Sequence, residues 1–226
     1  MHDRPGLIGR MWYDAAYWTM WGLFNFGFSY RGTGRGNIPK RGPVLIVSNH
    51  QSMFDPMLVG LSCPRYPTFL ARKNLFNVPV IGPAIRSLGS VPIDRGMGKD
   101  GIQSVLDRLN HGRAVLVFPE GERTHTGEVQ PLKPGISLLI KRVNCPVVPV
   151  GIMGAFEAWN RFMKIPHFSP LLLPRESSAV GVSVGKAIDP VRYKGVDRDE
   201  MLADLRNEIA KQVAVADTIR RSAFLR

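Results

Sequence analysis

The chain has 226 residues, enough for one sizeable α/β domain, and its 44% hydrophobic and 21% charged residues exclude an extensively disordered protein. Its two cysteines, Cys63 and Cys145, lie far apart and form no CxxC pair, which argues against a disulfide framework or a zinc site. A net charge of +12 predicts a surface that attracts polyanions such as nucleic acid, anionic lipid or phosphorylated substrates.

Residues 1–30 form an aromatic-rich segment that we expect to be helical. Its apolar part, residues 11–28, is interrupted by Asp14 and Asn25, whereas a spanning helix needs about 20 predominantly apolar residues. The segment also lacks the small-residue cleavage site of a signal peptide. Two interpretations stay open: an anchor in the membrane interface, which Trp and Tyr favour, or a helix that packs on the core.

Residues 31–226 are expected to form the main domain. A loop rich in Gly, Arg and Pro comes first, at residues 31–43, and its glycines do not match a dinucleotide-binding pattern. Apolar runs and helical periodicity then predict strands at 44–48, 68–71, 114–118, 147–152 and 179–184, and helices at 56–61, 82–88, 101–110, 135–143 and 201–219. This alternation predicts an α/β fold, with a mostly parallel central sheet flanked by helices and an N-terminal aromatic helix attached.

The stretch "VLIVSNHQSMFDP", Val44 to Pro56, places a histidine at the end of a strand and a carboxylate at the start of a helix. Functional sites collect at the carboxyl ends of strands in open α/β sheets. Across such a turn Asp55, predicted as the helix N-cap, can fold back onto His50, fix the imidazole tautomer and leave the other nitrogen to accept a proton. The alternative is that Asp55 serves only as the cap and His50 only as a polar strand end.

Three serines raise the possibility of a serine hydrolase. Ser48 and Ser52 flank the histidine too closely for the usual arrangement, in which the nucleophile comes from a separate element. Ser183 lies in "GVSVG", which matches the nucleophile-elbow string, but it sits inside an alternating strand pattern and not at a strand-to-helix turn. We therefore attribute that match to chance.

A second polar cluster follows the strand at 114–118, in "VLVFPEGERTHTG". Glu120, Gly121 and Arg123 would lie in a loop at the strand's carboxyl end, and arginine suits bidentate recognition of phosphate. Lys73 follows another strand, and Arg95 comes after Asp94 at the end of the segment between the two motifs. The alternatives are a surface turn with a local ion pair and a structural pairing of Asp94 with Arg95.

Taken in order, these residues resemble the glycerolipid acyltransferase family, which includes the 1-acylglycerol-3-phosphate acyltransferases. Four blocks carry the resemblance over about Val44 to Ile152: Asn49, His50 and Asp55 (NHx4D); Lys73, Leu75, Pro79, Gly82, Gly89, Ile93, Asp94 and Arg95; Phe118, Pro119, Glu120, Gly121 and Arg123 (FPEGTR); and Val148, Pro149 and Val150. Glu122 departs from the family, which usually has Thr there, and adds a negative charge beside the expected phosphate site.

The resemblance implies an acyl transfer. The acyl group of an acyl-CoA or acyl carrier protein thioester would move to the free hydroxyl of a lysophospholipid acceptor, with 1-acylglycerol-3-phosphate giving phosphatidic acid. His50 would be the general base and Asp55 its orienter. Lys73, Arg95 and Arg123 would hold the acceptor's phosphate, and Ser52, Glu120 and Gly121 are the other expected substrate-binding residues. No metal and no cofactor besides the thioester is implied.

The basic surface and the aromatic segment would hold such an enzyme on an anionic membrane, as a peripheral or monotopic protein on the cytoplasmic side of the cell membrane. Transfer to another lysophospholipid or polar lipid is an alternative, and a lipid hydrolase with water as the acceptor is another. A nucleic-acid-binding protein would account for the charge, but the chain shows no RNP-like, KH or helix-turn-helix signature. Nucleic acid is therefore not expected as a partner.

Overall fold

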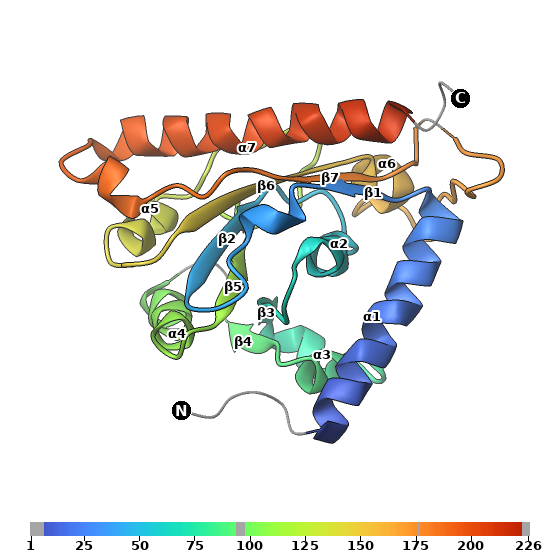
Figure 1. Cartoon of the computed structure of the whole chain (residues 1–226), viewed down its shortest axis with the longest axis horizontal. Helices are drawn as coiled ribbons and strands as arrows, with labels where there is room; N and C mark the ends of the chain where they lie inside the picture. The colour runs from blue at the N-terminus through green and yellow to red at the C-terminus, as the bar shows by residue number, and fades with distance from the viewer. Residues whose placement is uncertain (1–6, 94–97, 176, 223–226) are drawn as a thin grey trace.

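The computed structural model describes residues 7–93, 98–175 and 177–222, and its central feature is a seven-stranded sheet (Figure 1). The strands are β1 (Arg31–Thr33), β2 (Val44–Ser48), β3 (Thr68–Arg72), β4 (Val91–Ile93), β5 (Ala114–Val117), β6 (Val147–Met153) and β7 (Gly181–Val184). Their spatial order is β1-β7-β6-β2-β5-β3-β4, and every neighbouring pair is parallel except β6 and β7. The prediction of a mostly parallel α/β sheet is confirmed.

Helices lie on both faces of this sheet. They are α1 (Leu7–Phe28), α2 (Asp55–Ser62), α3 (Ile81–Ser87), α4 (Lys99–Asn110), α5 (Gly135–Ile140), α6 (Ala155–Trp159) and α7 (Arg198–Arg221), with 3-10 turns η1 (Arg35–Asn37), η2 (Lys73–Asn77) and η3 (Pro190–Tyr193). The side chains of β2 alternate between two buried clusters, because successive residues of a strand point to opposite faces. Val44 and Ile46 pack with α1, α2 and α6, whereas Leu45 and Val47 pack with α4, α5 and α7.

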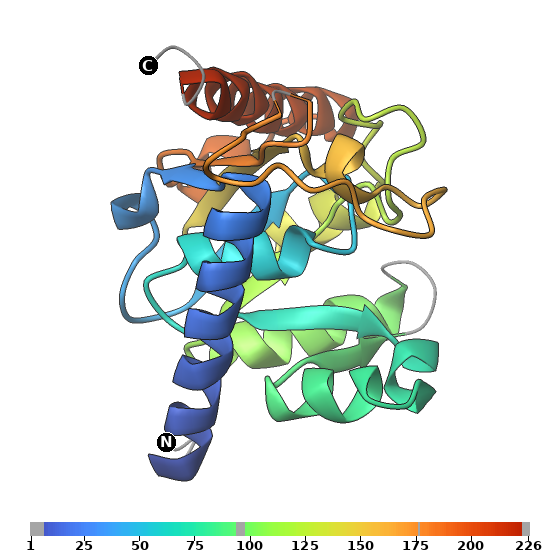
Figure 2. The same cartoon turned by 90° about the vertical axis from the view of Figure 1, so that its right-hand side faces the viewer.

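Helix α1 runs along one side of the molecule, and its two ends have different surroundings (Figures 1 and 2). Near its carboxyl end Phe24 and Phe28 are fully buried in the cluster shared with α2 and α6. Other large side chains stay exposed along its length, among them Met11 and Phe26. Part of the aromatic segment therefore packs on the core, and the role of the exposed part stays a prediction. Within the described ranges, no helix is both long enough and apolar enough to cross a bilayer.

Four short elements lie where the sequence did not predict them. The expected loop at 31–43 contains β1, which pairs with β7 through main-chain hydrogen bonds, and also η1. Strand β4 carries Pro92 at its centre, which an edge strand tolerates because one side of its backbone needs no partner. Helix α6 has only five residues, too few to show a helical period.

Asp55 was predicted as the N-cap of the helix after β2, and this prediction is wrong by one residue. Phe54 occupies the cap position without a side-chain hydrogen bond, and Asp55 is the first residue of α2. The carboxylate of Asp55 points away from its own helix, toward the turn that precedes it. The side chain is thereby available for the histidine at the end of β2.

Candidate active site

The two polar motifs meet because β2 and β5 are parallel neighbours in the centre of the sheet. Val47 lies beside Val117, so the residues after each strand emerge at the same edge. His50 and Phe118 stack there, with ring centroids 4.0 Å apart and an interplanar angle of 14°. The parallel pairing of β2 and β5 thus brings together residues that are about seventy positions apart in the sequence.

His50 and Asp55 form a hydrogen-bonded pair. The Nδ1 atom of His50 lies 2.7 Å from Oδ2 of Asp55, and the imidazole side chain is 19% exposed whereas the carboxylate is fully buried. The same oxygen accepts the backbone N–H groups of Gln51, at 2.5 Å, and Ser52, at 2.7 Å. These three bonds fix the carboxylate beneath the imidazole, and Nε2 is left as the nitrogen that can take a proton.

The loop after β5 holds the backbone of His50 on both sides. The N–H group of His50 donates to Oε1 of Glu120 at 2.9 Å, and its carbonyl oxygen accepts from the N–H group of Thr124 at 2.8 Å. Glu120 also accepts from the N–H group of Gln130 through Oε2, at 3.2 Å. The second motif therefore positions the first through main-chain contacts.

Glu120 is buried, with 2% of its surface exposed. Burial raises the pKa of Glu120 from 4.5 to about 7, although the hydrogen bonds from His50 and Gln130 act in the opposite direction. A carboxylic acid costs less to bury in its neutral form, so desolvation dominates. The group contacts backbone and does not line the cavity in front of His50.

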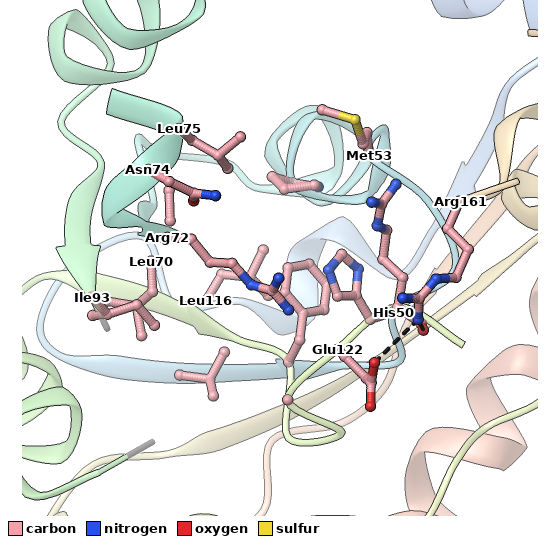
Figure 3. Close-up of a pocket in the computed structure, with 16 residues that line it drawn as sticks. His50, Met53, Leu70, Arg72, Asn74, Leu75, Ile93, Leu116, Glu122 and Arg161 are labelled. Atoms are coloured by element: carbon pink, nitrogen blue, oxygen red, sulfur yellow. Dashed lines mark hydrogen bonds and ion pairs between the residues drawn. The ribbon is translucent and has the colours of Figure 1, made fainter. Parts of the chain in front are cut away.

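A cavity of about 360 Å³ opens in front of His50, between α2, the β3–η2 turn and the loop after β5 (Figure 3). One part of its wall is apolar, with the side chains of Met53, Leu70, Leu75, Ile93 and Leu116. Its cations are Arg72, Arg123 and Arg161. In Figure 3, Arg72 extends toward His50 from the β3 side, and Arg161 lies on the opposite side. The cavity combines a proton acceptor, a positive rim and an apolar wall.

Arg161 also forms an ion pair with Glu122, the residue of the second motif that departs from the family. Its Nη1 atom lies 3.1 Å from Oε2 of Glu122 and 2.8 Å from Nε2 of His125, and it donates to the carbonyl oxygen of Arg123 at 3.2 Å. The negative charge that replaces the family's Thr therefore has its own partner. Burial lowers the pKa of the Arg123 guanidinium, and the nearby positive charge of Arg161 lowers it further.

The predicted site residues fall into two groups. His50, Gly121 and Arg123 line the cavity, and Asp55 lies directly behind His50. Three others do not line it: Ser52, Lys73 and Glu120. The predicted binding residue Arg95 lies outside the described residues.

The position of each of these three residues has a local reason. Ser52 is buried, with its hydroxyl donating to the carbonyl of Trp159 and accepting from the N–H group of Phe54. Glu120 accepts the backbone N–H groups of His50 and Gln130, so its carboxylate is turned toward the main chain and not toward the cavity. Lys73 is exposed outside the cavity. The strand β3 ends at Arg72, one residue later than predicted, and Arg72 lines the cavity instead.

Two arginines of the cavity were missed, and only one of them had a signal in the sequence. Arg72 is the last residue of β3, directly before Lys73, and its place at a strand end is the signal that the sequence offers. Arg161 follows α6 and belongs to no recognisable motif, so only the fold brings it to the site.

The serines are placed as expected for a protein without a serine nucleophile. Ser183 lies inside β7, where its hydroxyl donates to Oε1 of Gln212 at 2.8 Å. Ser48 is buried in β2, away from the cavity lining. Because Ser183 lies inside a strand and not at a strand-to-helix turn, the interpretation of "GVSVG" as a chance match is confirmed.

Comparisons with known proteins agree with this arrangement. The family model described as Acyltransferase matches residues 30–153, more than half of the chain. A chloroplastic 1-acyl-sn-glycerol-3-phosphate acyltransferase of Brassica napus is 34% identical over 125 residues, covering 54% of this chain and 36% of that protein. One from Borreliella burgdorferi is 24% identical over 186 residues, covering 80% of this chain and 70% of the relative.

A solved structure shares the fold. The crystal structure of the 1-acyl-sn-glycerophosphate acyltransferase PlsC from Thermotoga maritima superposes with a TM-score of 0.70 at 23% identity, covering 92% of this chain and 79% of that one. The chain spans only 36% to 43% of the length of three of the curated relatives that it matches.

Proposed function

Because the chain belongs to the acyltransferase family, we propose that it moves a fatty acyl group from a thioester to the free hydroxyl of a lysophospholipid. The acceptor that we favour is 1-acylglycerol-3-phosphate, which would give phosphatidic acid. Relatives with that printed activity support this choice. The observation that carries the proposal is the His50–Asp55 pair, which opens into a cavity with an arginine rim and an apolar wall.

In this mechanism His50 acts as the general base. Its Nε2 removes the proton of the acceptor hydroxyl as the oxygen attacks the thioester carbonyl carbon. The tetrahedral intermediate then collapses, the carbon–sulfur bond breaks, and the leaving thiolate takes up the proton from the imidazolium. Asp55 holds the tautomer and stabilises the imidazolium while it carries the proton. Stacking on Phe118 restrains the orientation of the ring.

The side chains that line the cavity are suited to bind both substrates of this reaction. Guanidinium groups bind phosphate bidentately, so Arg72, Arg123 and Arg161 are suited to hold the acceptor's phosphate near His50. Holding both reactants in one cavity replaces a bimolecular encounter by a positioned one. The apolar side chains from β3, η2, β4 and β5 suit the fatty chain of one of the substrates.

The proposal also covers the acyl donor and the location of the protein. The donor is an acyl-CoA or acyl carrier protein thioester, and the acceptor is a membrane lipid. The exposed side chains of α1 and the net charge of +12 suit a peripheral or monotopic protein at an anionic membrane surface, on the cytoplasmic side.

The test is thiol release by the purified chain with acyl-CoA or acyl carrier protein donors and a series of lysophospholipids. We expect release that depends on the acceptor, and loss of a factor of about a hundred or more in His50→Ala. His167→Ala is the matched control, because His167 is exposed and lies outside the cavity lining. Thiol release that proceeds equally without an acceptor would establish the hydrolase alternative, and a folded, fully active His50→Ala protein would contradict the mechanism.

A further inference from the structure

A second cavity lies at the amino ends of β2 and β5, whereas His50 lies beyond the carboxyl end of β2. It has a volume of about 710 Å³ and is lined by α1, the turn before β2, the end of α2 and the turn before β5. Gly42 and Gly112, which line it, come before β2 and β5, whereas His50 and Phe118 follow them. Because β2 has five residues and each advances by about 3.3 Å, the two cavities are roughly 15 Å apart. The second cavity is therefore separate from the one that opens in front of His50.

The cations of this cavity outnumber its carboxylates. Asp14 is the one carboxylate among the residues that line it, and it accepts a hydrogen bond from the hydroxyl of Tyr66 at 2.8 Å. The lining cations are Arg10, Arg35, Lys40, Arg41, Arg65 and Arg113. Six like charges around one concave surface repel each other, and an anion bound among them would relieve that repulsion.

Two of these cations are held in place before any ligand arrives. Arg35 donates to the hydroxyl of Tyr17 and to the carbonyl of Cys63, both at 3.2 Å, and its guanidinium lies 5.8 Å from the centre of the Tyr17 ring. Arg65 donates to the carbonyl of Gly112 at 3.0 Å. Such restraint reduces the conformational entropy that ligand binding would cost. By contrast, Lys40 and Arg41 are exposed at the mouth of the cavity.

The remaining wall of the cavity is a flank of α1. Tyr13, Tyr17 and Trp18 contribute to the lining, and Trp18 is itself exposed. Ile8, Met11 and Phe26 lie on the adjoining outward side of the same helix and are also exposed. Figure 2 shows the loop before β2 and the connection after α2 on one side of α1. A basic cavity thus borders an apolar helix surface, which matches a molecule with an anionic head and apolar tails.

We propose that this cavity binds the phosphate-bearing headgroup of an anionic membrane lipid, whose acyl chains lie against the outward side of α1. The proposal rests on the membrane location included in the proposed function and assigns it a discrete site. An acidic carrier protein would also be attracted by the cations, but the concave shape and the apolar helix beside it favour a lipid. Occupation of the site would place α1 at the level of the lipid headgroups and would not involve the arginines of the cavity in front of His50.

The experiment compares two doubly charge-reversed variants of the full chain. Lys40→Glu/Arg41→Glu reverses two charges at the mouth of the cavity. Lys141→Glu/Arg142→Glu is the control: these two consecutive residues follow α5, are exposed and do not line this cavity. Both variants have the same net charge. Flotation is measured with vesicles of phosphatidylcholine and with vesicles that also contain phosphatidylglycerol. Activity on a short-chain, water-soluble acceptor is measured in parallel.

We expect the wild type to prefer the anionic vesicles, and Lys40→Glu/Arg41→Glu to weaken that binding by about tenfold or more, since each basic residue near an anionic surface contributes substantially. The α5 variant should retain most of the binding, and all three proteins should keep their activity on the soluble acceptor. If the wild type shows no activity on the soluble acceptor, the proposed function is contradicted. The vesicle-binding result can still be interpreted in that case.

Four results would overturn the lipid site. Equal losses in the two variants would mean diffuse attraction to the membrane and no site. Unchanged binding in Lys40→Glu/Arg41→Glu would mean that the cavity is not used. Calorimetry showing that free glycerol phosphate binds as tightly as the vesicles would assign the cavity to a soluble phosphate compound. Weaker binding of acyl carrier protein by this variant, with vesicle binding intact, would assign it to the carrier protein.

Discussion

Replacing Asp55 by Asn tests whether the buried carboxylate works through His50. The two side chains have nearly the same shape, and the amide oxygen can still accept the N–H groups of Gln51 and Ser52. The amide carries no charge, so the hydrogen bond to Nδ1 of His50 ceases to be charge-assisted. Hydrogen bonds to charged groups contribute about 1.5–3 kcal/mol, roughly twice as much as neutral ones.

The catalytic loss should exceed the loss of stability. An imidazolium without its carboxylate forms less readily, and we expect kcat to fall by about 10²- to 10⁴-fold, the range for a general base and its orienter. Weakening three bonds to a fully buried group should lower the free energy of unfolding by about 2–3 kcal/mol. Asp55→Ala should be less stable than Asp55→Asn, because it leaves two backbone N–H groups without their acceptor.

A double-mutant cycle separates a positioning role from a general structural one. Thiol release is measured for wild type, Asp55→Asn, His50→Ala and the double variant, with urea unfolding of each protein. If Asp55 acts through His50, the second substitution should add little once His50 is gone. Asp197→Asn is the control, because Asp197 caps α7 and Asn is an equally good cap. A near-normal kcat in Asp55→Asn, or the same loss with and without His50, would refute the reasoning.

Two further predictions follow from the site. The pKa of Glu120 is raised from 4.5 to about 7 in the folded protein. Between these pH values the unfolded chain has lost the proton of Glu120, whereas the folded chain keeps it. The free energy of unfolding therefore falls as pH rises through this window. Urea unfolding of Glu120→Gln should show a smaller fall there, and an unchanged pH dependence would contradict this origin. Arg123→Ala should raise the KM of the acceptor by about tenfold or more and that of the donor less, since a charge-assisted contact is lost. Lys73→Ala, outside the cavity, should change the acceptor KM far less, and equal effects of the two substitutions would contradict the cavity assignment.

Several features were predictable because they depend on residues close in sequence. The alternation of apolar runs and helical periods predicted the α/β sheet, since each period reflects burial of one face. His50 and Asp55 are separated by one turn, so a strand followed by a helix suffices to bring them together. Arg123 and Gly121 follow a strong strand signal at β5 and reach the cavity for the same reason.

The errors concern features for which the local sequence carries little information. Strand β1 forms from main-chain pairing with the open edge of β7, which leaves no pattern in the side chains Arg31, Gly32 and Thr33. Lys73 and Arg72 differ by one position, and the exact end of β3 decides which of them faces the cavity. The pairing of Arg72 with Ile93 of β4 extends β3 one residue past its predicted end.

The sequence by itself determined the chemical groups on which the proposed function rests: a histidine with a carboxylate one turn away, a Gly-containing loop with an arginine, and an excess of positive charge. Only the tertiary structure decided which cations share a cavity. Arg72, Arg123 and Arg161 come from three different elements, and six other basic residues gather at the opposite edge of the sheet, beside α1. Such groupings arise from packing between elements that are distant in sequence, and no local pattern encodes the distance between them.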